Sequence, residues 1–170
     1  MAIIKSVRGF TPVFGTGCFI AENAVVVGEV SLGDECTVWF NAVLRGDVHS
    51  ITVGNNTNIQ DGAIIHCTYQ KAKTVIGSNV SIAHGAIIHG CTLGDNVLVG
   101  MGAIVMDDAV VGSNSVIAAG AVVLPGTQIE AGSIYGGMPA RRLKDIGPEM
   151  MEVIARTARN YPMYAKWYDQ

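Results

Sequence analysis

Residues 59–93, IQDGAIIHCTYQKAKTVIGSNVSIAHGAIIHGCTL, decide the fold. Aliphatic residues recur in this stretch at a spacing of six, which resumes after an inserted loop expected at residues 71–75. A helix would need a period of 3.6 residues, and simple strand alternation would not place an aliphatic residue at every sixth position. The six-residue series comprises Ile59, Ile65, Ile76, Ile82 and Ile88.

The same spacing runs through most of the chain, from Ile20 to Ile129, with a break at residues 48–52. The fifth position of each hexad is mostly small or β-branched. The second is often glycine or alanine, as at Gly77, where a corner needs an unencumbered backbone. One aliphatic and one small inward residue per hexad fit a narrow coil of three short strands and about 18 residues per turn. The pattern therefore predicts an all-β protein, a parallel β-helix of hexapeptide type.

Composition narrows the class of protein. Of 170 residues, 49% are apolar and 21 are glycine while only 6% are aromatic, so the core should be aliphatic and small. The net charge of −3 provides no broad basic face for nucleic acid. We find no signal peptide and no run of about 20 apolar residues, and we expect a cytoplasmic protein that does not bind membranes. The four cysteines form no CxxC pair and are expected to be free thiols.

The repeat stops after Ser133, which suggests a β-helix domain at residues 1–140 and a C-terminal helix and tail at residues 141–170. Pro148 is expected at the first position of that helix, where proline is favoured, and Pro162 should kink or end it. An apolar stripe predicts that the helix packs along the outside of the coil. The stripe consists of Met150, Met151, Ile154, Ala158 and Tyr161.

Three of the four histidines have related positions in the coil. His66 and His89 both occupy the second position of a third hexad, so they should stack about 4.8 Å apart, close enough to bind one ion at Zn–N distances of about 2.0 to 2.1 Å. His84 lies on another face, separated from His89 by about 16 Å of extended chain. A neighbouring subunit can supply it, because a closed ring repeats the same contact at each interface. Three protein ligands leave a fourth position for water, as in catalytic zinc sites.

The alternative is that these are unrelated surface histidines, but two equivalent positions in adjacent coils favour a shared site. His49 falls at the break in the repeat and is expected to be a surface residue. Cys67 and Cys91 flank the histidines without stacking with them, so we interpret them as buried thiols rather than ligands.

Two pairs of polar residues accompany the histidines. Gln60 and Asp61 lie one coil before His84 and should approach from its side. Arg45, the only arginine between residues 9 and 140, is next but one to Asp47. We favour a salt bridge between these two at a subunit contact over a solvated surface charge, because the guanidinium fork suits a carboxylate.

Several segments, FIAENAVVVGEV, AVLRGD, NIQDGAIIHC, SIAHGAIIHGCTLGDNVLVGMGA and GGMPAR, resemble the gamma-class carbonic anhydrase-like proteins over about residues 11–142. The resemblance implies a left-handed coil and a homotrimer with three interfacial ions, usually zinc and in some members iron or cobalt. It implies reversible hydration of carbon dioxide to bicarbonate by a metal-bound hydroxide that Gln60 orients. By position, the resemblance assigns the metal ligands to His66, His84 and His89, the interface pair to Arg45 and Asp47, and the residues beside the metal-bound water to Gln60 and Asp61.

The chain departs from the fully active family members at the residues that carry the proton away. Acidic residues in those members correspond to Val48 and to a position within Cys67-Thr68-Tyr69 here, which predicts weak activity. Tyr161 resembles a tyrosine that several members bring over the site. Two other functions stay open: a hexapeptide-repeat acyltransferase using acyl-coenzyme A, and a trimeric metal-binding protein without turnover. An acyltransferase would need one histidine as a base, and would not need three histidines that converge on one site.

Overall fold

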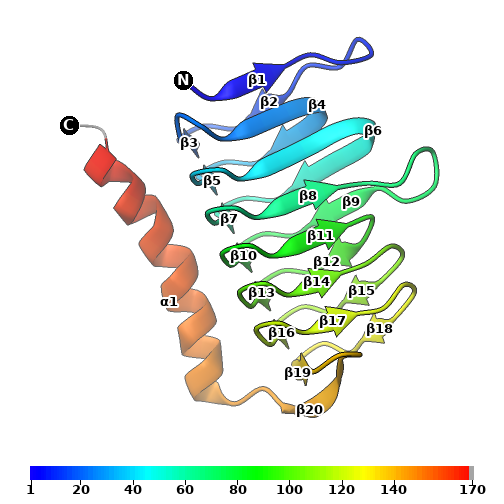
Figure 1. Cartoon of the computed structure of the whole chain (residues 1–170). Coiled ribbons are helices and arrows are strands. Elements are labelled where there is room, and N and C mark those ends of the chain that lie inside the picture. The colour runs from blue at the N-terminus through cyan, green and yellow to red at the C-terminus, as the bar shows by residue number, and fades with distance from the viewer. Residues whose placement is uncertain (169–170) are drawn as a thin grey trace.

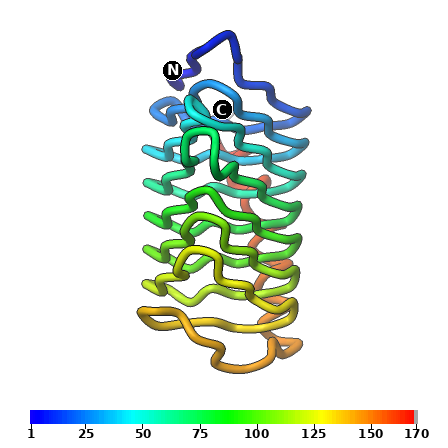
Figure 2. The backbone as a smooth tube through the Cα atoms, turned by 90° about the vertical axis from the view of Figure 1, so that its right-hand side faces the viewer, coloured from blue at the N-terminus to red at the C-terminus, as the bar shows by residue number. Residues whose placement is uncertain are grey.

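The computed structural model describes residues 1–168 and consists of stacked coils with one helix alongside (Figure 1). Strands on successive coils pair in parallel, and the coils follow one another along a single axis (Figure 2). The pairing joins Ile59 to Ile82 and Ile65 to Ile88, as the spacing of six predicts. The parallel β-helix predicted from the sequence is therefore confirmed.

Two sheets form the three faces of the coil. The twelve-stranded sheet covers two faces, because β6 (Val43–Val53) pairs with β8 through its first residues and with β9 through its last. The other strands of this sheet are β1 (Ile3–Lys5), β2 (Val13–Phe14), β4 (Val25–Leu32), β8 (Ile64–His66), β9 (Thr74–Ile76), β11 (Ile87–His89), β12 (Thr92–Leu93), β14 (Ile104–Val105), β15 (Val110–Val111), β17 (Val122–Val123) and β18 (Gln128–Ile129). The eight-stranded sheet contains β3 (Phe19–Ile20), β5 (Thr37–Val38), β7 (Asn58–Ile59), β10 (Ser81–Ile82), β13 (Leu98–Val99), β16 (Val116–Ile117), β19 (Ser133–Gly136) and β20 (Arg141–Asp145).

Both interruptions of the repeat that the sequence predicted are present, but the inserted loop lies at other residues than expected. The break expected at residues 48–52 coincides with a register shift inside the continuous strand β6: Gly46 pairs with Gly28 and Ile51 with Val30, so residues 47–50 lie opposite Glu29 alone. The inserted loop occupies residues 67–73 rather than 71–75, and a bridge between Thr68 and Ala72 closes it. Strand pairing of β9 with both β6 and β12 explains the difference, since it draws residues 74 and 75 into the sheet.

The interior is a column of aliphatic side chains with small residues between them. Ile65 and Ile88 are fully buried, and so are Ala63 and Ala86. Burying such an isoleucine contributes about 1.5 to 3 kcal/mol. Gly77 shows why the second position is often glycine: a Cβ there would lie 2.7 Å from the backbone of the next coil. The unencumbered corner expected there therefore reflects the close approach of coils.

The helix α1 (Pro148–Ala165) lies against the eight-stranded sheet and runs back along the stack to a short 3-10 turn, η1 (Lys166–Tyr168) (Figure 1). It begins at Pro148 as predicted, and Ile154 packs against Val116 and Ile134. Pro162 does not end the helix, because packing of the turns that contain Ile154 and Ala165 outweighs the one hydrogen bond that proline removes.

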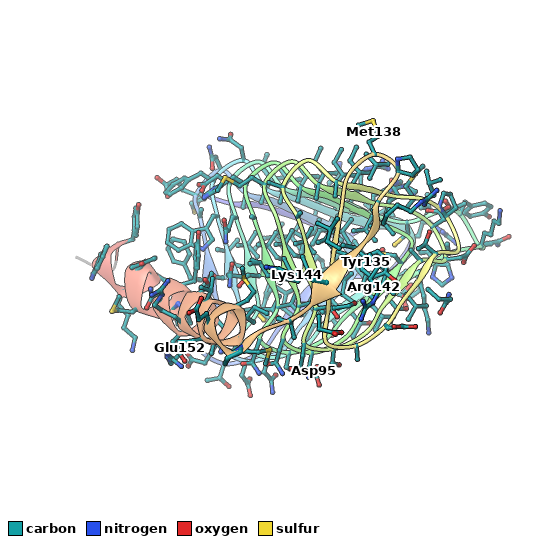
Figure 3. The ribbon with its side chains drawn as sticks, turned by 90° about the horizontal axis from the view of Figure 1, so that it is seen from below. Asp95, Tyr135, Met138, Arg142, Lys144 and Glu152 are labelled. Carbon is teal, nitrogen blue, oxygen red and sulfur yellow. The ribbon has the colours of Figure 1, made fainter. Side chains whose placement is uncertain are left out.

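The last strand, β20, crosses the end of the coil (Figure 3). It pairs antiparallel with β19, although all five of its residues remain exposed. It therefore covers one open edge of the stack. In the part of the chain that the structure describes, no helix combines the length and apolar character needed to cross a bilayer.

Candidate metal centre

His66 and His89 end the neighbouring strands β8 and β11 and face each other across one coil spacing. Strand pairing sets them opposite each other, which confirms the predicted stacking. The Nδ1 atom of His66 lies 3.1 Å from Nε2 of His89, and the ring centroids are 5.1 Å apart. Their side chains are 17% and 34% exposed, so one edge of the pair is open to a further ligand.

Each of these two rings has a carboxylate at its other nitrogen. Asp47 lies 3.2 Å from Nε2 of His66, and Asp107 lies 2.5 Å from Nδ1 of His89. The four side chains form a line along the stack in the order Asp47, His66, His89, Asp107. Carboxylate partners of this kind orient metal-binding histidines and fix their tautomers.

The hydrogen atoms of this line can be assigned by counting donors. A carboxylate only accepts, so His66 donates from Nε2 to Asp47 and His89 donates from Nδ1 to Asp107. Burial lowers the pKa of His66, although its hydrogen bond to Asp47 acts in the opposite direction, and a lowered pKa favours a neutral ring with one N–H. With one proton on each ring, the two nitrogens that face each other both carry lone pairs and are 3.1 Å apart.

Two such lone pairs repel unless a cation lies between or beside them. Two ligands on a tetrahedral zinc ion, with bonds of about 2.0 to 2.1 Å, have their nitrogens about 3.3 Å apart. The separation of 3.1 Å in this protein is close to that value. The donor set at His66 and His89 therefore fits a divalent metal ion.

His84 is on a different face of the coil, in the turn after β10. Its side chain is 47% exposed, and its Nδ1 lies 2.9 Å from Asp61. All three candidate ligands thus have a carboxylate partner. Within residues 1–168, no group of three His, Cys, Asp or Glu side chains is placed to hold one ion. A site with three histidines would need His84 from another subunit.

His49 differs from the other three histidines. Its Nδ1 accepts a hydrogen bond from the backbone N–H of Ser50 at 2.8 Å. Among the described residues it has no carboxylate partner within 4 Å. It is a half-buried residue that provides a matched control for the other histidines.

Gln60 and Tyr161 lie on the side of the coil that carries His84. Gln60 is 4% exposed, and its amide nitrogen donates one of its two N–H groups to Asn58 at 2.9 Å, which leaves the carbonyl oxygen and one N–H for another group. Tyr161 packs edge-on against Trp39, with ring centroids 5.4 Å apart. Burial, with a contribution from the nearby charge of Asp61, raises the pKa of Tyr161 to about 12. The phenol is therefore protonated at neutral pH.

Arg45 and Asp47 form an ion pair within one chain, at 2.6 Å. Burial disfavours ionisation of Asp47, but hydrogen bonds from Arg45 and His66 outweigh it and lower the pKa of the carboxyl. Arg45 is 46% exposed, and Arg8 donates to the backbone oxygen of Asp47 at 3.2 Å. The guanidinium of Arg45 therefore has an open side where a neighbouring chain can approach.

Asp107 was missed by the sequence reasoning. It follows Val105 by two positions, so it stacks on Gly90 and reaches His89 diagonally. Its second oxygen accepts a hydrogen bond from Thr68 at 2.5 Å. Burial opposes ionisation of this carboxyl, but the hydrogen bonds from Thr68 and His89 lower its pKa. A glycine after each of His84 and His89 was visible in the sequence, but only Gly90 makes room for a carboxylate.

The positions at which the family resemblance led us to expect acidic residues are apolar or neutral here. Val48 packs against the core, and Tyr69 is 57% exposed beneath the guanidinium of Arg8. All four cysteines are free thiols, and burial raises the pKa of Cys91 to about 12 and that of Cys67 above its ordinary value. These two thiols are protonated at neutral pH and are poor candidates for metal ligands.

An exposed apolar stripe adjoins the histidine pair. Ile64, Ile87 and Ile104 are paired in register on β8, β11 and β14, with side chains directed away from the core. Ile64 is 42% exposed, and the other two are half-buried. A continuous outward-facing row of isoleucines on a sheet is typical of a protein contact.

Comparison with known proteins finds relatives over most of the chain. The family model described as "Bacterial transferase hexapeptide (six repeats)" matches residues 73–107 and 90–125. Gamma carbonic anhydrase 1, mitochondrial, from Arabidopsis thaliana is 39% identical over 160 residues, which are 91% of this chain but only 58% of that relative's length. A probable carbonic anhydrase of Methanocaldococcus jannaschii is 45% identical over 142 residues, covering 84% of this chain and 89% of the relative. The crystal structure of a hexapeptide transferase family protein from Anaplasma phagocytophilum has a TM-score of 0.93 at 39% identity over 98% of each chain.

Proposed function

Because the chain belongs to the gamma carbonic anhydrase family of left-handed hexapeptide-repeat proteins, we propose that it is a metal-dependent enzyme that hydrates carbon dioxide reversibly to bicarbonate. The observation that supports this most is the line Asp47, His66, His89, Asp107, in which a nitrogen of His66 faces a nitrogen of His89 at 3.1 Å. We propose zinc as the ion, with iron or cobalt as alternatives.

The third ligand in this proposal is His84 of a neighbouring chain in a homotrimer. Asp61 lies 2.9 Å from Nδ1 of His84, so this ring also has a carboxylate beside it. The isoleucine stripe next to His66 and His89 would form part of the subunit contact, since burying it removes apolar area from water. Arg45, open on one side, would complete the contact by pairing across the interface.

Gln60 and Tyr161 would have separate roles beside the metal ion. A bound divalent ion lowers the pKa of water toward about 7 and so supplies a nucleophile for carbon dioxide at neutral pH. The carbonyl oxygen of Gln60 would accept a hydrogen bond and orient that nucleophile, with the side chain held in place by its hydrogen bond to Asn58. Tyr161 stays protonated and would act as a hydrogen-bond donor near Asp61, not as a base.

Release of the proton is the weak step in this proposal. Neither Val48 nor the segment Cys67-Thr68-Tyr69 provides a carboxylate to accept it. Thr68 is moreover occupied as a donor to Asp107. We therefore expect slow hydration in which a buffer molecule removes the proton, and turnover should rise with the concentration of an imidazole-type buffer.

An acyltransferase is the second candidate, because a close structural relative carries a transferase family name. An acyltransferase needs one base and a binding site for acyl-coenzyme A, and would not require three histidines with a carboxylate on each. A trimeric metal-binding protein without turnover would share the metal site and differ only in the rate of hydration.

The test measures metal content and turnover on protein purified without a histidine tag. We expect about one ion per chain and hydration of carbon dioxide by stopped flow. His66→Ala and His84→Ala should both lose the metal, whereas His49→Ala should keep it. Metal retained by His84→Ala would contradict the shared site. Transfer from acetyl-coenzyme A by a metal-free preparation would favour the acyltransferase.

A further inference from the structure

We propose that Asp107 is a positioning residue for His89: it keeps the ring proton on Nδ1 and so leaves the lone pair of Nε2 directed at the metal position. This inference rests on the proposed function for its consequence in metal binding, but its geometry stands within one chain. Asp107 Oδ1 lies 2.5 Å from Nδ1 of His89, on the side of the ring opposite His66.

The need for such a residue follows from the short distance between the two rings. Without a partner at Nδ1, a neutral His89 would carry its proton on Nε2 and donate it to the Nδ1 lone pair of His66, 3.1 Å away. That hydrogen bond would satisfy both rings and occupy the position of the metal. An acceptor at Nδ1 reverses the preference, because a charged acceptor binds the N–H more strongly than a neutral one.

Two neighbours place the carboxylate of Asp107. The hydroxyl of Thr68, in the inserted loop, donates to the second oxygen of Asp107 at 2.5 Å, so the carboxylate is held from both ends. Gly90 leaves the necessary space, since a Cβ at that position would lie 2.5 Å from Asp107 Oδ1. The inserted loop therefore has a structural role in this chain, because its Thr68 holds the carboxylate of Asp107.

The adjacent residue provides a matched control. Asp108 is exposed, whereas Asp107 is half-buried, and Asp108 has no hydrogen bond to a histidine among residues 1–168. Asp107→Asn and Asp108→Asn each replace a carboxylate by an amide, so each removes one negative charge, at adjacent positions. A difference between these variants therefore reports the contact with His89, not the net charge or the fold.

The first measurement is the tautomer of His89 in metal-free protein at alkaline pH, by nitrogen-15 correlation spectra of the imidazole rings. His89→Gln identifies the signal. Wild type and Asp108→Asn should show the Nδ1–H form, and Asp107→Asn should shift His89 toward the Nε2–H form, as loss of an orienting carboxylate does in other sites. Thr68→Val should give a smaller shift in the same direction. An unchanged tautomer in Asp107→Asn would overturn the proposal.

The second measurement is zinc affinity by competition with a chelator. Asp107→Asn should bind zinc about 10 to 100 times more weakly than wild type, and Asp108→Asn should bind like wild type. Equal affinities of Asp107→Asn and wild type would also overturn the proposal. Should wild type bind no zinc, the proposed function fails, whereas the tautomer of His89 still decides the role of Asp107.

Discussion

Replacing Gly90 by alanine should weaken metal binding by displacing Asp107, without touching any ligand. The new Cβ would lie 2.5 Å from Asp107 Oδ1 and 2.8 Å from the Cβ of Ala72, so both the carboxylate and the inserted loop must move. Gly90 also has a φ of +56°, which costs an alanine about 1 to 2 kcal/mol. Loss of the hydrogen bond to the charged carboxylate adds about 1.5 to 3 kcal/mol.

Gly120 separates these two costs. It has a φ of +66°, and nothing lies within 4 Å of the Cβ that alanine would add. Gly120→Ala should therefore lose only the conformational part, about 1 to 2 kcal/mol in the free energy of unfolding. Gly90→Ala should lose about 1.5 to 3 kcal/mol more. It should also bind zinc about 10 to 100 times more weakly.

The assay is urea unfolding at one fixed chain concentration, together with chelator competition for zinc. The fixed concentration matters because the stability of an oligomer depends on it. The reasoning would be refuted if Gly90→Ala and Gly120→Ala had the same zinc affinity. It would also be refuted if Gly90→Ala were no less stable than its control, since the clash at Asp107 would then be relieved without loss.

Two further predictions concern Arg45 and Tyr161. Arg45→Ala should shift sedimentation at low micromolar concentration from trimer to smaller species. If the trimer buries the pair of Arg45 with Asp47, its loss costs about 3 to 5 kcal/mol. An unchanged trimer would mean that the pair stays solvated, where it contributes at most about 1 kcal/mol. Tyr161 should ionise near its pKa of about 12, not near 10. The absorbance of wild type and of Tyr161→Phe at 295 nm should therefore be equal at pH 10 and should differ only as the pH approaches 12. Ionisation of Tyr161 at pH 10 would contradict its packing against Trp39.

The coil and the stacking of two histidines were predictable because a strict spacing converts sequence position into spatial position. Ile65 and Ile88 differ by one coil, and the residues that follow them must then be neighbours. The place of the inserted loop was less certain from sequence. Counting hexads from Ile65 put it at residues 71–75, whereas pairing of β9 with strands on both sides places it at residues 67–73.

The spacing of the repeat could not predict contacts between side chains that are not directly opposite each other on neighbouring coils. Asp107 does not stack on His89 but on Gly90, and it reaches the ring only because Gly90 has no side chain. The engagement of Gln60 by Asn58 depends on side-chain rotamers that a repeat does not specify. Pro162 was expected to kink or end the helix, and α1 nevertheless continues to Ala165, because packing against the sheet outweighs local propensity.

The central claim is that one metal site combines His66 and His89 of one chain with His84 of another, and mixing two inactive variants tests it most directly. His84→Ala and His89→Ala chains are co-expressed in equal amounts, and zinc is measured in the whole population of trimers that forms. Each variant alone should hold almost no metal. Random mixing in a three-membered ring restores about one quarter of the sites, because a His84→Ala chain still offers His66 and His89 to the intact His84 of a neighbouring chain. About one quarter of the wild-type zinc content is therefore the predicted result. Mixed trimers with no more zinc than either variant alone would contradict a site shared between subunits.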